Sequence, residues 1–400
     1  MKAVSMVSNV ATQDAGTVTT DAKAATTVRA AIVVSSPVKA ELADMIKAGE
    51  APRRDYFELR NMLGAELLAP PANPSWPYRL LHLLGGHALA MACTAWWRHR
   101  EYDVVLTDQE ACGLVLGMLF KLTRVRMAHV MISHYLTPAK KQVFYRLFGV
   151  QSHIACTVCY STAQHRLARE RLGLAPHQVR LVLHPADDKF WVPACSDAER
   201  AEDAQLLRQA GLDLPEDAPV VCSAGLEFRD YPTLLRAARM LPASTLVVIA
   251  ASSPWSKRKN TAQGADLPRN VRLVSLKPLQ LRALYRRSRV VAIPLYDVDF
   301  QAGSLVAYEA MACGKPVVMT RTRGQNDILR DGETGLYVRV GDAYDMADAL
   351  NRLLADPELA RAMGRRGRAV VEQGLNLDAY LQQMVRLVRE VAGHAVAQRT

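Results

Sequence analysis

No apolar run in this chain is long enough to cross a membrane. The longest apolar stretch, residues 80–97, is interrupted by two histidines and two adjacent glycines, whereas a helical span needs about 20 consecutive apolar residues. The first 27 residues are rich in Ala, Thr, Val and Ser and lack the apolar core of a secretory signal. We therefore expect residues 1–27 to form a disordered extension, and the remainder to be a cytoplasmic protein that is at most peripheral to a membrane.

The chain also lacks the cysteine pairs of a disulfide framework or a zinc site. Its seven cysteines are scattered and odd in number, which favours a reducing compartment. Cys156 and Cys159, with His153 and His165 nearby, invite a metal or redox interpretation, but no second cysteine pair exists. Two cysteines three apart on a strand point to opposite faces, so we expect core thiols. No paired-aspartate motif for a metal is visible either.

Nucleic-acid recognition motifs are missing as well, although the formal net charge is +11. The sequence has no recognition-helix pattern, no RNA-binding aromatic motif and no zinc-finger spacing, and we expect no nucleic-acid partner. Lysines and arginines do gather among aromatic and aliphatic residues between positions 96 and 146. This segment predicts a surface attracted to anionic lipid or to a polyanionic acceptor. The alternative is a set of ordinary solvated helix faces.

The chain contains alternating strand and helix patterns, and the alternation occurs twice. Because 400 residues suffice for two domains, this predicts an α/β protein with two Rossmann-like domains and parallel sheets. The boundary lies within residues 195–218, a charged helix followed by a turn-rich segment. Expected strands are 30–35, 102–107, 126–133, 152–158 and 179–183 in the first domain, and 220–224, 245–250, 271–275, 290–294 and 317–320 in the second. Expected tail helices are 342–354, 357–373 and 377–392.

Residues 301–337 carry the most specific signal. A loop of small and polar residues, 301–304, precedes a helical segment, 305–312, with Glu309 on its second turn. Unpaired N–H groups at a helix start bind anions, and a carboxylate further along can bind hydroxyls. This combination suits a nucleotide diphosphate sugar in the cleft at the carboxyl ends of the strands. The alternative is a strand–helix unit without a ligand.

The same stretch resembles the retaining glycosyltransferases of family 4, which have the GT-B fold. The resemblance rests on Glu309-Ala310-Met311-Ala312 and Gly314-Lys315-Pro316-Val317, with Gln301 in place of the family's first glutamate. It implies two Rossmann-like domains facing across a cleft. The implied divisions are an acceptor domain over 28–213, a nucleotide-sugar domain over 214–376, and a helix over 377–400 that packs back on the first domain.

Further roles follow from the resemblance alone. Glu309 is expected to hold ribose and Gln301 to lie beside the sugar, with the backbone of Gly303, Ser304 and Leu305 at the diphosphate. Arg229, in the loop after the strand at 220–224, is expected to take the role of the family's cation that faces the diphosphate. Alternatively, Arg229 pairs with Glu227 or Asp230. His134 should contact the anomeric side of the sugar. Candidates for the base are Leu276, Lys277 and Tyr296, and a weaker candidate for a second cation is Lys257.

Two other segments have less specific expected roles. Asp187 or Asp188, together with Phe190, occupies the turn that ends the family's first domain, and a structural role is expected there. The polar segment 49–56 lies where acceptor loops belong.

The resemblance thus implies a metal-independent enzyme without a cofactor that transfers a sugar from a UDP- or GDP-linked donor to a hydroxyl. The anomeric configuration would be retained because the diphosphate leaves and the acceptor attacks on the same face of the sugar. The acceptor would be a glycan, a lipid-linked sugar or a small metabolite. Two alternatives stay open. One is an epimerase or phosphorylase of the same fold, and the other is a non-catalytic nucleotide-sugar-binding protein.

Overall fold

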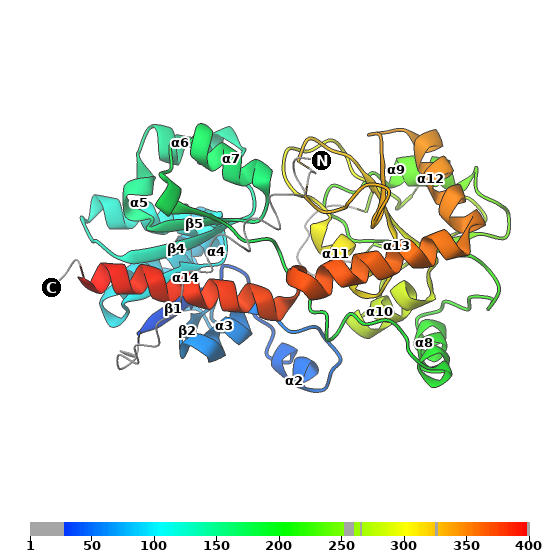
Figure 1. Cartoon of the computed structure of the whole chain (residues 1–400). Coiled ribbons are helices and arrows are strands. Elements are labelled where there is room, and N and C mark those ends of the chain that lie inside the picture. Colours follow the sequence, from blue (N-terminus) through cyan, green and yellow to red (C-terminus); the bar gives the residue numbers. More distant parts are fainter. Residues whose placement is uncertain (1–27, 252–259, 265, 325–326, 398–400) are drawn as a thin grey trace, which may run out of the picture.

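The computed structural model describes residues 28–251, 260–264, 266–324 and 327–397. Two parallel six-stranded sheets lie side by side, each flanked by helices (Figure 1). The first sheet has the order β2-β1-β3-β4-β5-β6. Its strands are β1 (Ala30–Val33), β2 (Glu66–Leu68), β3 (Val104–Thr107), β4 (Ala128–Ser133), β5 (Cys156–Cys159) and β6 (Val179–Leu181). The α/β class and the two-domain GT-B-type arrangement expected from the sequence are confirmed.

The second sheet repeats this plan with the order β12-β11-β10-β7-β8-β9. Its strands are β7 (Val220–Ala224), β8 (Leu246–Ala250), β9 (Val271–Val274), β10 (Val290–Ile293), β11 (Val317–Thr320) and β12 (Gly335–Val338). Every residue of β7, β10 and β11 is buried, as expected for strands covered on both faces. Both sheets therefore offer only their strand ends to a ligand.

Helices cover both faces of each sheet. In the first domain they are α2 (Leu42–Lys47), α3 (Asp55–Leu63), α4 (Trp76–Trp97), α5 (Glu110–Leu122), α6 (Ala139–Arg146) and α7 (Thr162–Glu170). In the linker and second domain they are α8 (Asp197–Gln209), α9 (Tyr231–Ala238), α10 (Pro278–Arg287), α11 (Ser304–Ala312), α12 (Ala343–Ala355) and α13 (Pro357–Val370), followed by α14 (Leu377–Ala397). In the second domain α10 and α11 pack on one face, and α9 and α12 on the other.

Some strand boundaries differ from the sequence prediction. The expected strand at 152–158 begins as a 3-10 turn, Val150–His153, and the strand forms only from Cys156. Cys156 and Cys159 then belong to the hydrophobic clusters on opposite faces of the sheet, which confirms them as core thiols. The edge strands β2 and β12 were not predicted.

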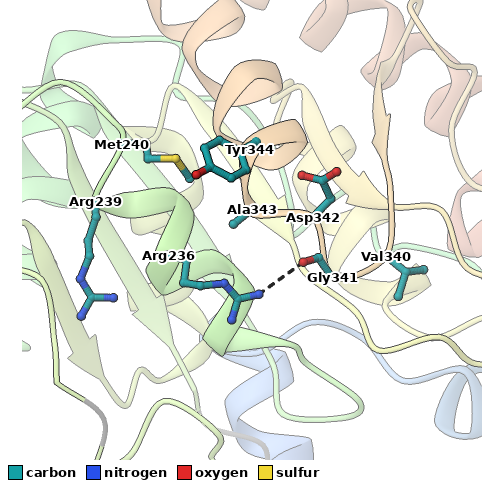
Figure 2. Close-up of a pocket in the computed structure, with 8 residues that line it drawn as sticks. All are labelled: Arg236, Arg239, Met240, Val340, Gly341, Asp342, Ala343 and Tyr344. Atoms are coloured by element: carbon teal, nitrogen blue, oxygen red, sulfur yellow. Dashed lines mark hydrogen bonds between the residues drawn. The ribbon is translucent and has the colours of Figure 1, made fainter.

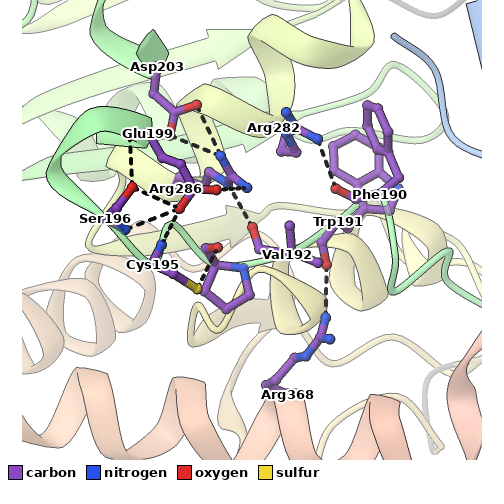
Figure 3. Close-up of polar contacts among 11 residues, drawn as sticks. Phe190, Trp191, Val192, Cys195, Ser196, Glu199, Asp203, Arg282, Arg286 and Arg368 are labelled. Carbon is purple, nitrogen blue, oxygen red and sulfur yellow. Dashed lines mark hydrogen bonds and ion pairs between the residues drawn. The ribbon is translucent and has the colours of Figure 1, made fainter. Parts of the chain in front are cut away.

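The linker after β6 is held by arginine side chains (Figure 3). Arg286 Nε of α10 donates to the Val192 carbonyl at 2.7 Å, and Arg368 Nη1 of α13 donates to the Trp191 carbonyl at 2.9 Å. Arg286 also pairs with the buried carboxylate of Asp203 in α8 at 3.4 Å. These bonds fix the linker to the second domain, since they satisfy carbonyls that a buried loop cannot expose to water.

The chain crosses between the domains a second time just before α14, beside the linker. Ala186 N donates to the Leu375 carbonyl at 2.9 Å, and Leu377 N donates to the Ala186 carbonyl at 2.8 Å. α14 then packs into the core of the first domain through buried residues that include Tyr380, whose hydroxyl lies 2.9 Å from that of Tyr160. The crossing helix implied by the resemblance is therefore observed.

The expected disordered extension, residues 1–27, lies outside the described residues. Within the described part of the chain, no helix is both long and apolar enough to cross a membrane.

Candidate functional site

The start of α11 lies at the carboxyl end of β10 and is shaped by Gly303. This residue has a φ of +77°, and a Cβ there would come within 2.9 Å of Ile293 Cγ2. Only glycine fits this conformation and space without strain. Gly303 has no side chain to cap the helix, and the first-turn amides of a helix have no partner within it. The expected amide-rich corner at 303–305 therefore has the geometry of an anion site.

Arg229 lies against this corner, although it comes from the loop after β7. A Cβ on Gly303 would be 3.5 Å from Arg229 Nη1. The guanidinium is buried and donates to the Ala224 carbonyl from Nε and to the Glu227 carbonyl from Nη1, each at 2.8 Å. Among the described residues it forms no ion pair with a carboxylate. The alternative of pairing with Glu227 or Asp230 is not observed, because the Asp230 carboxylate instead caps α9 by accepting from Thr233.

Glu309 is buried on the second turn of α11. Its Oε2 accepts a hydrogen bond of 3.0 Å from the Tyr285 hydroxyl of α10. Burial raises the pKa of Glu309 to about 7, while the Tyr285 bond and the charges of Arg54 and Arg229 act in the opposite direction. The carboxyl therefore sits near its ionisation point, fixed in direction by one donor and within electrostatic reach of two cations.

Gln301 precedes this corner and has buried, unused hydrogen-bonding atoms. Neither its amide oxygen nor its amide nitrogen forms a hydrogen bond of ordinary geometry among the residues that the structure describes, and the nearby buried hydroxyl of Tyr308, which interacts with Gln301, is in the same position. Leaving such groups unpaired costs about 1–3 kcal/mol each. A polar ligand such as a sugar would satisfy them.

The carboxyl ends of the two sheets contact each other beside Gln301. The ring of Tyr135, after β4, lies 4.4 Å from that of Phe300 between centroids. The Asp327 carboxylate accepts from Thr162 N at 2.7 Å and from Thr162 Oγ1 at 2.8 Å, at the start of α7. These contacts join the two domains beside Gln301.

His134 belongs to the same first-domain loop, one residue before Tyr135. Its backbone N–H donates to Glu110 Oε2 at 3.0 Å, and its ring Nε2 lies 3.1 Å from the Asp108 carbonyl oxygen. The exposed ring packs edge-on against Tyr160 at 4.9 Å between centroids. The structure thus brings His134 and Gln301 to the two sides of the domain contact.

The three candidates for the base do not gather at one place. Leu276 and Lys277 follow the edge strand β9 and precede α10, the helix that carries Tyr285, so they lie on the Glu309 side of the sheet. Tyr296 is 42% exposed and lies beside Thr261, near the charges of Asp230 and Arg236 at α9. The structure therefore leaves Tyr296 apart from the other two.

Arg54 was not singled out by the sequence, although it falls in the segment expected at the acceptor. Arg54 belongs to the first domain. Its positive charge acts to lower the pKa of Glu309 in the second domain and the pKa of His184 in its own domain. Its neighbour Arg53 is instead structural, because it pairs with Asp187 and Asp378, each at 2.7 Å. The structural role expected for the 187–190 turn agrees with these contacts. Lys257 lies outside the described residues.

An open hollow of about 570 Å³ lies away from these residues, between α9 and α12 (Figure 2). Arg236 crosses it to the Gly341 carbonyl at 3.3 Å, and Tyr344 stands at its rim. No candidate residue lines it. Among the described residues, no three His, Cys, Asp or Glu side chains gather as a metal site.

Comparison with known protein families places the second domain. Residues 209–370 match the family described as glycosyl transferases group 1. A D-inositol 3-phosphate glycosyltransferase of Corynebacterium aurimucosum is 31% identical over 289 residues, which are 66% of this chain and 66% of that protein. The lipopolysaccharide core biosynthesis glycosyltransferase LpsE of Rhizobium meliloti is 31% identical over 182 residues, 44% of this chain and 52% of that protein. The match thus spans two thirds or less of these relatives.

Solved structures extend the similarity of fold to both domains. Sucrose-phosphate synthase from Thermosynechococcus elongatus superposes with a TM-score of 0.67 at 20% identity, over 92% of this chain and 100% of that one. Anabaena Alr3699/HepE in complex with UDP-glucose superposes with a TM-score of 0.65 at 16% identity, over 89% of this chain and 98% of that one. At these identities the likeness concerns the fold.

Proposed function

Because the chain belongs to the glycosyl transferases group 1 family and has the GT-B fold, we propose that it transfers a sugar from a UDP- or GDP-linked donor to a hydroxyl acceptor with retention of configuration. The observation that carries this proposal is the corner formed by Arg229 and the start of α11. Among the described residues, the buried guanidinium there donates only to neutral carbonyls, and it lies beside the start of α11, which has no side-chain cap. Such a corner is suited to bind an anion, and a diphosphate carries the required charge.

Transfer is limited by departure of the nucleoside diphosphate. As the glycosidic bond breaks, positive charge develops on the sugar and negative charge on the leaving phosphate. Arg229 and the amides of 303–305 stabilise the leaving group because they are already oriented toward it before the bond breaks. These protein charges can do the work of a metal ion, so we propose a reaction that needs neither metal nor cofactor.

The remaining candidates hold the other parts of the donor. Glu309, aimed by Tyr285, accepts hydroxyls of the ribose. Gln301 and His134 frame the sugar from the two domains, and the loop of Leu276 and Lys277 contacts the base. The acceptor hydroxyl attacks on the face from which the diphosphate leaves, and the released phosphate takes its proton. The reaction would run in the cytoplasm, where the free thiols stay reduced.

A donor panel tests the proposal. Thermal unfolding is measured with each UDP- and GDP-linked sugar, since a ligand that binds only the folded state raises the unfolding temperature. The donor with the largest shift is then incubated with acceptor extracts, and the anomeric configuration of the product is read by NMR. Transfer with retention supports the proposal. Inversion, phosphate-dependent cleavage, or binding with no transfer would each contradict it.

A further inference from the structure

The outward side of α4 begins with a stripe of exposed apolar side chains. Trp76, Leu80, Leu83 and Leu84 follow the i, i+4, i+7, i+8 spacing of one face of the first part of α4, which ends at a kink at Gly85 and Gly86. Trp76 is 75% and Leu83 82% exposed. The opposite side of the helix packs on the first sheet through Tyr78. Soluble monomers rarely expose contiguous apolar surface of this kind, and where they do it marks an interaction site.

The far ends of α4, α5 and α6 expose further apolar side chains. Trp97, Leu122 and Leu147 are 79%, 73% and 74% exposed. Hydrogen bonds join these ends, because Trp96 Nε1 donates to Thr123 Oγ1 at 3.0 Å and Lys121 Nζ donates to the Gly149 carbonyl at 2.9 Å. We use the name α4–α6 face for the exposed residues of these joined helix ends together with the stripe on the first part of α4.

Positive charge prevails in this region, where the exposed Glu101 at the end of α4 is paired with Arg98. Residues 111–169 contain eight lysines and arginines and neither aspartate nor glutamate. Arg100, Arg124 and Arg146 are exposed at the same helix ends as Trp97, Leu122 and Leu147. Within the described residues, none of these three arginines forms an ion pair. Their charges are therefore available to an anionic partner.

We propose that the α4–α6 face docks on the surface of an anionic lipid bilayer. Tryptophan and leucine side chains enter the boundary between headgroups and acyl chains, while arginines remain at the level of the lipid phosphates. A second copy of this chain fits less well, because a two-fold interface would bring like-charged arginines together. Nucleic acid would use the arginines but not the leucine stripe. The proposal concerns the first domain and does not depend on donor binding in the second.

Vesicle sedimentation of the full chain tests this surface. Vesicles of phosphatidylcholine alone are compared with vesicles that also contain phosphatidylglycerol, at low and high salt. The wild-type protein is expected to bind the anionic vesicles, less so at high salt. The triple variant R100S/R124S/R146S should bind on the order of 100-fold more weakly, since each arginine near such a surface contributes about fivefold. The double variant L83S/L84S should also weaken binding.

A matched variant, R208S/R269S/R352S, removes three exposed arginines outside the face and should bind like the wild type. Thermal unfolding of every variant shows that the fold is intact, and thermal shift by UDP reports the second domain separately. The proposal is overturned if wild-type protein sediments with neither vesicle, or if the matched variant weakens binding as much as R100S/R124S/R146S. It is also overturned if the leucine variant abolishes a dimer while leaving vesicle binding unchanged.

Discussion

The hydroxyl of Tyr285 donates a hydrogen bond to Glu309 Oε2 at 3.0 Å. This bond joins α10 to α11 inside the second domain, where both side chains are fully or nearly fully buried. The carboxyl that we assign to the ribose is therefore oriented before any ligand binds. Preorganisation of this kind lowers the cost of binding, because fewer rotamers are lost when the ligand arrives.

Glu309 should make the stability of the free protein depend on pH. Its pKa rises from 4.5 to about 7 on folding because of burial, so the folded state holds the proton more tightly than the unfolded state. The resulting stabilisation is complete below about pH 4.5 and is lost as the pH rises through 7. As the pH rises from 5 to 8, the free energy of unfolding of the wild-type protein should fall by up to about 3 kcal/mol relative to that of Glu309→Gln. Urea unfolding of both proteins across this pH range measures the difference. If the free energies of unfolding of the two proteins change with pH in parallel, the prediction is contradicted.

Tyr285→Phe should weaken nucleotide binding without contacting the nucleotide. The variant removes only the hydroxyl that aims Glu309, a hydrogen bond worth about 0.5–1.5 kcal/mol, so the Kd for UDP or GDP should rise roughly 2- to 10-fold. Tyr344→Phe removes an exposed hydroxyl outside the site and serves as the control. Isothermal titration gives both values. Equal affinities in the two variants would show that Tyr285 does not position Glu309.

Arg229→Ala should lower kcat by ~10²–10³, the usual cost of losing one oriented donor to a developing negative charge. The loss should be large because, among the described residues, we assign no other cationic side chain to the diphosphate. Arg269→Ala, an exposed arginine in the same domain, is the control. Steady-state kinetics with the best donor decide the matter, provided that thermal unfolding shows both variants folded. An unchanged kcat would remove Arg229 from the site.

Asp327→Ala should loosen the contact between the domains. The variant removes all three hydrogen bonds that Thr162 N and Oγ1 donate to the carboxylate, while the linker and α14 still connect the domains. We expect a larger radius of gyration in small-angle scattering and a higher KM for the donor. Asp331→Ala removes an exposed ion pair with Arg321 and a hydrogen bond from Tyr337 N, both within the second domain, and should leave both values unchanged. A compact Asp327→Ala protein would contradict the expectation.

Local sequence patterns predicted most of the strands of the fold. The strands at 220–224 and 317–320 were predicted with their observed bounds, because runs of Val, Met and Cys are typical of strands buried on both faces. The edge strands β2 and β12 were missed, although the equally short edge strands β6 and β9 were predicted. β2 begins on the exposed Glu66 and β12 on Gly335, and neither residue is typical of a buried strand. The turn at Val150–His153 replaced the start of a predicted strand, since an apolar run alone does not fix where the ladder begins.

The site was less accessible to sequence reasoning. Gln301, Gly303 and Glu309 share one short segment, so their spacing placed them together. Arg54 was missed because its proximity to Glu309 arises only where two domains meet, and no local pattern encodes that contact. The partners of Arg229 are backbone carbonyls, which every residue carries and no sequence pattern marks.

The most direct measurement is a crystal structure with a bound nucleoside diphosphate. We expect diphosphate oxygens within about 2.7–3.2 Å of the amides of residues 303–305 and of the Arg229 guanidinium, with ribose hydroxyls on Glu309. A nucleotide bound elsewhere, for instance in the hollow between α9 and α12, with protein side chains filling the corner at Gly303, would contradict the account.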